Sequence, residues 1–315
     1  MASGAVGFIG ILVDNFASHH QYRNEAYRAY DPGMAMWMPA LWVSPVEGAA
    51  LVAQIGKAGH GAARDVMAEL HLQGELSRQT GRGVYGILPG LSEETILVQS
   101  HHDSATTGAV EDASGAAEVL ALARYFGQMP RSARPRTLMF ATMDTHFTDY
   151  AVHKSFATQH LKAGNPSGRK VVAALTVEHV GREFIRGPDG EPKASGLVVP
   201  RGLMVSTEVA GFEALALETM RRFKLERTVA VSTSMLQRVG GHPGLPADSS
   251  DFLRAGVPVI ALVGAPLYLY DEIDTTDKVA RDELGKVARA FAYMVERIGK
   301  MPSAAFKRLE DTTDF

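Results

Sequence analysis

The sequence of 315 residues contains no cysteine, so disulfide bonds and thiolate metal ligands are excluded. Any metal ion must be held by histidine, aspartate or glutamate. The sequence also lacks a run of apolar residues long enough to span a membrane, and a formal net charge of −3 shows no excess of basic residues. We therefore expect neither nucleic acid nor a membrane surface as partner.

What remains is the composition of an ordinary globular protein. Apolar residues make up 46% of the chain and charged residues 21%, which is enough for a sizeable core. The length fits one large or two medium domains. The apolar residues 4–13 lack the basic start of a signal peptide, and they predict an internal strand, as if the chain began inside a domain.

Two parts of the chain differ in pattern. Residues 1–80 predict a small α/β or β-rich unit with strands at 6–13, 39–44 and 66–72 and a helix at 47–57. After residue 80, apolar strands alternate with amphipathic helices. The predicted strands are 84–88, 96–98, 138–141, 171–177, 202–206, 229–232 and 257–263, and the helices are 116–126, 150–161, 212–223 and 277–298. We expect an α/β fold with a mostly parallel or mixed sheet and helices on both faces.

The stretch 96–115 offers the clearest chemistry. Residues 96–98 predict a buried strand, and His101 and Asp103 stand where it ends. The pair Glu111-Asp112 follows on a loop bounded by glycine. Ligands of open α/β sheets bind outside the carboxyl ends of the strands, so these groups suit a metal site better than a loop of capping acids.

Titratable side chains also follow three further predicted strands. They are Asp144 and His146, then Glu178 and His179, and after a loop Asp271, Glu272 and Asp274. Parallel strands bring their carboxyl ends to one edge of a sheet. Carboxylates clustered there repel each other unless a cation or a proton offsets them. Histidine and carboxylate without sulfur suit zinc, manganese or a similar divalent ion.

Other candidate functional residues are supported by weaker sequence signals. His179 is either a supporting partner of a ligand or a solvent-capped residue, and His153 fits a packing role on its helix. His242 lies in a Gly/Pro loop that either covers a cleft or is simply exposed. Ser104 and Ser114 lack the Gly-x-Ser-x-Gly context of a serine hydrolase, and no phosphate-binding glycine pattern is present.

These motifs together resemble peptidase family M28, whose members are dinuclear zinc peptidases. The resembling segments are His101-x-Asp103-Ser104, Gly108-Ala109-x-Glu111-Asp112-Ala113-Ser114-Gly115, Arg136 to Ala141, Ala247 to Phe252 with Ala255 to Pro258, and Ile273 to Asp277. Residues 4–13 and 39–49 resemble a protease-associated domain. The resemblance implies a protease-associated-like unit, truncated or whole, over 1–80, and a peptidase domain over 81–315.

The resemblance also implies roles for single residues. The first metal histidine of the family falls on His101, and its supporting aspartate falls on Asp103. The bridging aspartate falls on Glu111, with Asp112 as a substitute one residue later.

The remaining family positions are changed in this chain. The paired glutamates, a general base and a ligand, fall on His146-Phe147. The next acidic ligand falls on Glu178, and the last metal histidine falls on Asp274. The metal site is therefore expected to be remodelled.

Two interpretations compete. In the first, the chain hydrolyses amide or peptide bonds with one or two divalent ions. The expected ligands are His101, Glu111, Asp112, Glu178 and Asp274. Zinc is the expected ion. His146 either binds the ion or accepts the proton, Asp144 is a second candidate for the proton acceptor, and Asp103 is in support. In the second, the fold has lost its chemistry and binds a partner. The replacements His146, Glu178 and Asp274 can all bind metal, which favours the enzyme; the oligomeric state is left open.

Overall fold

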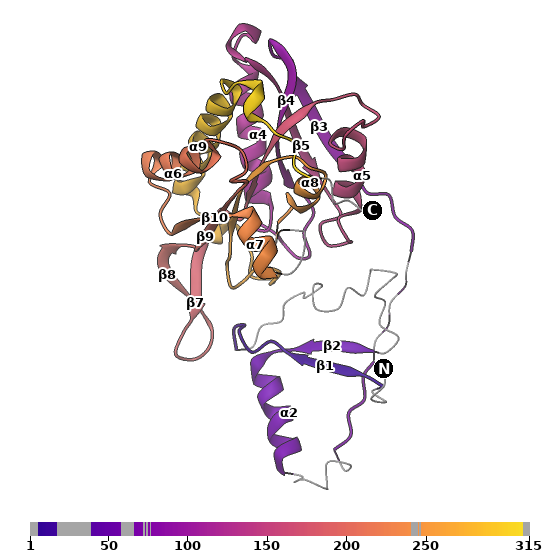
Figure 1. Ribbon diagram of the computed structural model, residues 1–315. Coiled ribbons are helices and arrows are strands. Elements are labelled where there is room, and N and C mark those ends of the chain that lie inside the picture. Colours follow the sequence, from indigo (N-terminus) through magenta and orange to yellow (C-terminus); the bar gives the residue numbers. More distant parts are fainter. Residues whose placement is uncertain are drawn as a thin grey trace.

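The computed structural model describes residues 6–17, 39–57, 66–71, 73, 75, 77–240, 245 and 247–310. Two units are visible, a small one set apart from a large one (Figure 1). The small unit consists of β1 (Phe8–Ile11), β2 (Ala40–Val43) and α2 (Pro45–Lys57). Its two strands pair in parallel. The loop with His242 lies outside the described residues.

Local sequence explains where α2 begins. The hydroxyl of Ser44 accepts a hydrogen bond from the backbone N–H of Glu47 at 3.3 Å, and the Glu47 carboxylate accepts one from the backbone N–H of Ser44 at 3.0 Å. This reciprocal pair is a capping box. The strand predicted at 66–72 is wrong: residues 66–71 form no strand, and Met67 is 86% exposed. A strand needs a neighbour that completes its hydrogen bonds, and these residues have none within the described part.

The large unit is built on a seven-stranded sheet. Its strands are β3 (Gly83–Leu88), β4 (Ser92–His101), β5 (Arg136–Met143), β6 (Val171–Glu178), β9 (Arg201–Val205), β10 (Thr228–Ser232) and β11 (Val259–Gly264). They lie in the order β10-β9-β11-β6-β4-β5-β3. The pairs β4–β5, β4–β6, β6–β11 and β9–β10 are parallel, whereas β9–β11 and β3–β5 are antiparallel. The predicted α/β fold with a mostly parallel or mixed sheet is confirmed.

Helices cover both faces of this sheet. They are α4 (Ala113–Gly127), α5 (Ala151–His160), α6 (Phe212–Phe223), α7 (Thr233–Gly240), α8 (Ser250–Arg254) and α9 (Arg281–Gly299), with single 3-10 turns η2 (Arg131–Ala133), η3 (Thr276–Lys278) and η4 (Ser303–Ala305). On β4, Ile96 and Val98 pack into the core cluster that contains α4, α6 and α9. Leu97 between them packs into the cluster of α5 and α8. Successive residues of a strand point to opposite faces of the sheet, so this one buried run contributes to the cores on both faces. Figure 1 shows α9 and α5 on opposite sides of the sheet.

An antiparallel hairpin projects from the large unit, formed by β7 (Arg182–Arg186) and β8 (Pro192–Val198). The strands predicted from the sequence do not include this hairpin, so it is an addition to the expected fold. Its turn closes with a hydrogen bond from the N–H of Gly187 to the carbonyl of Glu191 at 2.8 Å. Gly190 in that turn has φ of 85°, a conformation open to glycine.

The sheet brings the predicted site to one edge. Strands β4, β6 and β11 run in parallel, so His101, Glu178 and Gly264 all stand at carboxyl ends. The backbone N–H of His102 donates to the carbonyl of Met143 at 2.9 Å, which holds the end of β5 beside them. Among the described residues, none of the helices is long and apolar enough to cross a membrane.

Candidate metal centre

Glu111 is the centre of the buried cluster at this edge. Its Oε1 lies 3.2 Å from Nε2 of His101, and its Oε2 faces Nε2 of His179. The side chain of His101 is fully buried, and that of Glu111 is 1% exposed. The three residues come from the end of β4, the loop before α4 and the end of β6.

The hydrogen bonds of His101 and His179 determine the tautomer of each ring, and so which ring nitrogen keeps a lone pair. Nδ1 of His101 lies 3.0 Å from the backbone carbonyl of Asp103, and Nδ1 of His179 lies 2.8 Å from the backbone carbonyl of Gly264. A carbonyl oxygen only accepts, so each Nδ1 carries the hydrogen and each neutral ring presents Nε2 as an acceptor.

Glycine at position 264 makes this arrangement possible. A Cβ there would lie 2.3 Å from the carbonyl oxygen of His179, so a larger residue would push the end of β11 away. His179 itself has φ of 60°, the left-handed region that is uncommon for a residue other than glycine. Backbone strain of this kind gathers at functional sites, where the surrounding structure holds it.

A cation fits the atoms that these side chains leave unsatisfied. Nε2 of His101, Nε2 of His179 and both carboxylate oxygens of Glu111 are buried and have no hydrogen-bond partner among the described residues. Lone pairs that face each other in a buried site repel unless a proton or a metal ion lies between them. The distances allow His101, Glu111 and His179 to share one ion.

Without an ion, protons must supply the compensating charge. Burial alone lowers the pKa of the His179 imidazole, but the facing carboxylate of Glu111 outweighs it and raises this pKa to about 10. Burial alone raises the pKa of Glu111, and the imidazoles of His179 and His101 reverse this and hold it below its usual range. Opposed pKa shifts of this kind make a buried cluster a candidate functional site.

A third imidazole, that of His146, lies against the cluster. Its ring stacks on the ring of His101 with centroids 4.0 Å apart, and its Nε2 is 3.8 Å from Oε1 of Glu111. Its Nδ1 is 2.8 Å from Oδ1 of Asp248, and the hydroxyl of Tyr150 lies 3.4 Å from its Nε2. His101, His146 and Asp248 form a second group with the spacing of a metal site.

Asp248 also faces a second histidine, His153 on α5. Nε2 of His153 lies 3.3 Å from Oδ2 of Asp248, and both side chains are fully buried. The sequence predicted a packing role for His153. The structure adds that its imidazole faces a carboxylate which it shares with His146.

The predicted site residues Asp103 and Glu178 lie at the cluster. Oδ1 of Asp103 is 3.2 Å from Nδ1 of His101, a supporting position. Oε1 of Glu178 accepts the backbone N–H of Asp248 at 3.1 Å, and its Oε2 is 3.9 Å from Nε2 of His179. Burial, together with the negative charge of Asp248, raises the pKa of Glu178 well above its ordinary value.

The two other acids predicted as ligands are occupied by backbone N–H groups. Asp112 caps α4: its Oδ1 accepts from the N–H of Gly115 at 3.1 Å and of His179 at 3.0 Å. Asp274 accepts the N–H of Val110 on Oδ1 and the N–H of Glu111 on Oδ2, both at 2.9 Å. Both carboxylates therefore hold the loop and the strand end that carry the cluster.

Two residues close to His146 in sequence, Asp144 and Phe147, do not make the contacts expected of a proton acceptor and a metal ligand. The carboxylate of Asp144, a predicted proton acceptor, accepts a hydrogen bond at 2.8 Å from the backbone N–H of Arg82, which lies just before β3. Phe147, which stands where a ligand was expected, is 7% exposed. Its ring packs edge-on against Tyr270 at 5.4 Å and against His101 at 6.0 Å, so it forms a wall of the cluster.

Sequence reasoning missed the importance of His179 and Asp248. The signal for His179 was its place directly after Glu178 at a strand end, and the signal for Asp248 was its place in the Ala247 to Phe252 segment. Neither signal separates a residue that faces the cluster from one that faces solvent, because that depends on backbone conformation at the site.

Residues 83–183 match the model of peptidase family M28. The fold agrees with solved structures described as a peptidase M28 precursor from Shewanella amazonensis SB2B and as an aminopeptidase from Aneurinibacillus sp. strain AM-1. The first has a TM-score of 0.63 and 20% identity and covers 98% of this chain and 63% of its own. The second has a TM-score of 0.56 and 19% identity and covers 86% and 60%. These findings support peptidase family M28.

A third structure with this fold is BSAP, a zinc aminopeptidase from Bacillus subtilis, with a TM-score of 0.52 and 13% identity over 73% of this chain and 53% of its own. The present chain thus spans less than two thirds of each of these three structures. No curated protein matches the sequence. At such identities the likeness to solved structures establishes the fold, and the M28 match covers the part of the chain that carries His101, Glu111, His146 and His179.

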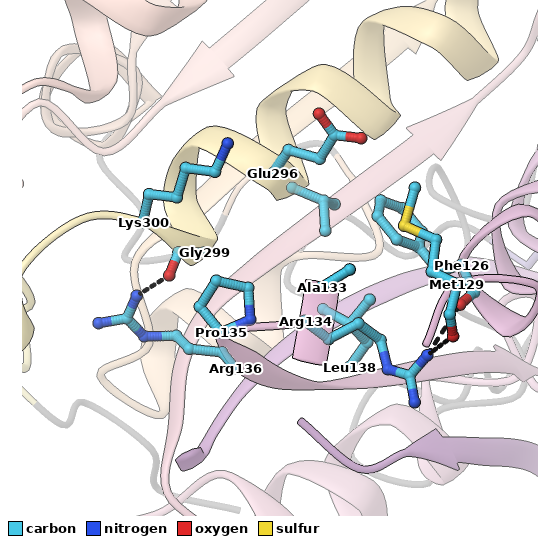
Figure 2. A pocket seen from close by; sticks show the side chains of 11 residues that line it. Phe126, Met129, Ala133, Arg134, Pro135, Arg136, Leu138, Glu296, Gly299 and Lys300 are labelled. Carbon is cyan, nitrogen blue, oxygen red and sulfur yellow. Dashed lines mark hydrogen bonds between the residues drawn. The ribbon is translucent and has the colours of Figure 1, made fainter. Parts of the chain in front are cut away.

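A separate cavity of about 180 Å³ lies at the opposite end of the sheet (Figure 2). Phe126, Leu138 and Val295 line it, and Arg136 at the start of β5 borders it. The Arg136 guanidinium donates to the backbone carbonyl of Gly299 at 2.6 Å, so this charge is already engaged by the end of α9. The cluster of His101, Glu111 and His179 stands at the carboxyl ends of the strands, and the residues that line the cavity are not among its members.

Proposed function

We propose that this chain is a metal-dependent hydrolase of peptide or amide bonds, with a centre richer in histidine than the sequence predicted. His101, His179 and Glu111 hold a divalent ion, and His146 lies beside it. One observation carries the proposal: four buried ligand atoms from these three residues face each other and have no hydrogen-bond partner among the described residues.

The donor set favours zinc. Two imidazole nitrogens and a carboxylate, without sulfur, are ligands that zinc accepts, and a catalytic zinc keeps three protein ligands and one open position. The carbonyl groups of Asp103 and Gly264 fix the tautomers of His101 and His179, as the supporting partners of metal-bound histidines do. Bound there, a divalent ion would lower the pKa of water and polarise a substrate carbonyl.

The chain supplies the proton acceptor. Asp248 takes the N–H of Nδ1 of His146, so Nε2 keeps its lone pair, with the Tyr150 hydroxyl at 3.4 Å and Oε1 of Glu111 at 3.8 Å. An imidazole held in this way accepts a proton from the attacking water and returns it to the leaving amine. His146 thus takes the place of the carboxylate that the M28 resemblance implies at this position.

The M28 match of residues 83–183 supports the proposal, and so does a fold shared with zinc aminopeptidases. Peptides or related amides are the substrate class that we propose. The protease-associated character of residues 1–80 and the division of the chain at residue 80 stay predictions.

The test begins with protein purified without added metal. We expect about one equivalent of zinc by elemental analysis and hydrolysis of a panel of aminoacyl anilides and short peptides. His101→Ala and His179→Ala should lose both metal and hydrolysis. The matched control is His102→Ala, since His102 is an exposed neighbour of His101.

Three outcomes separate the possibilities. Metal and hydrolysis that disappear in both variants but not in the control support the proposal. Metal that is bound without hydrolysis would favour a binding module on the same fold. Metal content that does not depend on His179 would overturn the ligand set.

A further inference from the structure

Phe16 belongs to the N-terminal segment, yet its side chain is buried in the large unit. It is 0% exposed and forms a core cluster with Val110 and Tyr268. The partly buried residues Phe184, Leu267, Ile273 and Val279 pack against this cluster. A fully buried phenylalanine is a strong anchor, because large aromatic side chains dominate the energetics of packed interfaces.

Two of the residues in this packing stand next in the chain to acids at the proposed metal centre. Val110 precedes Glu111, and Ile273 precedes Asp274. The N–H groups of Ala109, Val110 and Glu111 all donate to Asp274, the first to its backbone carbonyl at 3.1 Å and the others to its carboxylate at 2.9 Å. The loop that presents Glu111 is thus fastened to Asp274, and the Phe16 cluster includes the residue before each of the two acids.

Further contacts hold the segment of Phe16 in place. The N–H of Ala17 donates to the carbonyl of Gly190 in the turn of the β7–β8 hairpin at 2.8 Å. The guanidinium of Arg186 on β7 donates to the carbonyl of Val13 at 2.8 Å and to the carbonyl of Asn15. The segment 13–17 is therefore fixed on both sides of Phe16, and its position is set by the large unit.

We propose that Phe16 is a positioning residue for the metal centre: it fills the space behind Val110 and Ile273 and thereby holds the carboxylate of Glu111 toward His101 and His179. The inference rests on the proposed function in so far as Glu111 is a ligand there. Its mechanical part, that Phe16 keeps the Ala109–Glu111 loop on Asp274, holds with or without an ion.

The experiment measures this mechanical part first, by hydrogen exchange of the full chain followed with mass spectrometry. In Phe16→Ala, the amides of residues 109–111 should exchange at least about ten times faster than in the wild type, because their hydrogen bonds to Asp274 open more often. Phe16→Leu, which fills most of the same space, should restore most of the protection. Phe212→Ala is the matched control, since Phe212 is also 0% exposed but packs in the core of α4, α6 and α9.

Zinc affinity, measured by competition with a chelator, is the second readout. We expect Phe16→Ala to bind zinc roughly ten- to a hundred-fold more weakly than Phe212→Ala, the range seen when supporting partners of metal ligands are removed. Unchanged exchange at 109–111 in Phe16→Ala, or equal exchange in both alanine variants, would overturn the inference. Faster exchange at 109–111 in Phe16→Ala, together with a wild-type chain that binds no zinc, would instead leave the inference standing and refute the proposed function.

Discussion

Nδ1 of His146 lies 2.8 Å from Oδ1 of Asp248, although 102 residues separate them in the chain. The other carboxylate oxygen of Asp248 faces His153 at 3.3 Å. One buried carboxylate thus serves two imidazoles, and only one of these, His146, also lies beside Glu111. Asp248 is therefore the residue through which α5 and the segment before α8 fix the proposed proton acceptor.

Replacing Asp248 by Asn should lower hydrolysis by about ten- to a hundred-fold, the usual effect of losing a partner that orients a catalytic group. The neutral amide removes the negative charge that Asp248 places beside His146 and His153, and its NH2 group cannot accept a hydrogen bond. The measurement is kcat/KM with zinc saturating. Asp149→Asn is the control, because Asp149 lies on the loop that carries His146, is 45% exposed and pairs with Lys154. Equal activity of Asp248→Asn and the wild type would contradict the role given to His146.

Replacing Asp274 by Asn should destabilise the metal-free protein. The amide nitrogen would face a backbone N–H of Val110 or Glu111, and a buried donor left without an acceptor costs about 1–3 kcal/mol. Thermal unfolding in the presence of a chelator measures this cost. If Asp274 served only as a metal ligand, the chelated wild type and variant would melt together.

Glu118 on α4 should make stability depend on pH. It is 2% exposed, neither of its carboxylate oxygens has a hydrogen-bond partner among the described residues, and burial raises its pKa from 4.5 to about 8. The folded state thus prefers the protonated form. Its contribution to the free energy of unfolding is intact below pH 4.5 and is lost as the pH rises toward 8.

Glu118→Gln should therefore raise the free energy of unfolding at pH 8 by roughly 1–3 kcal/mol and change it little at pH 4. Denaturant unfolding at the two pH values gives the difference. Glu208→Gln, at an exposed position, controls for the loss of one charge. A variant that is less stable than the wild type at pH 8 would show that the Glu118 carboxylate has a partner that its geometry does not reveal.

Zinc should raise the melting temperature of the wild type and leave that of His179→Ala almost unchanged. A ligand that binds only the folded state stabilises it by about 2.7 kcal/mol at a free concentration one hundred times its Kd. His102→Ala should respond to zinc as the wild type does, since His102 is exposed. An equal zinc response in His179→Ala would remove His179 from the ligand set.

Most of the fold could be predicted from the sequence, because strand and helix periods are local signals. The run Ile96-Leu97-Val98 indicated a strand buried on both faces, and its residues pack into two different cores. The antiparallel pairing of β9 with β11 could not be predicted, since strand direction within a sheet depends on connections across the whole chain. The strand expected at 66–72 failed for a related reason: among the described residues, no strand pairs with 66–71.

The convergence of these side chains could be predicted from the sequence, but not the contacts that each of them makes. Acids and histidines that follow several strands predicted a cluster at one edge of the sheet, and His101 and Glu111 lie 3.2 Å apart at that edge. His179 could not be assigned, because its approach to Glu111 depends on a backbone φ of 60° and on the missing side chain at Gly264. Asp274 resembled a ligand, yet its oxygens accept two backbone N–H groups, a contact that no residue pattern encodes.

The central position of β4 has a consequence for the lifetime of the cluster. β4 lies between β5 and β6, and residues 94–101 along it are buried. Amides in such a strand exchange only when a protein opens globally, whereas loops and edges open in small local events. His101 is therefore built into the slowest-opening part of the molecule, while Glu111 stands on a loop that can open alone. An ion held between them would leave at the rate at which that loop opens, long before the sheet unfolds.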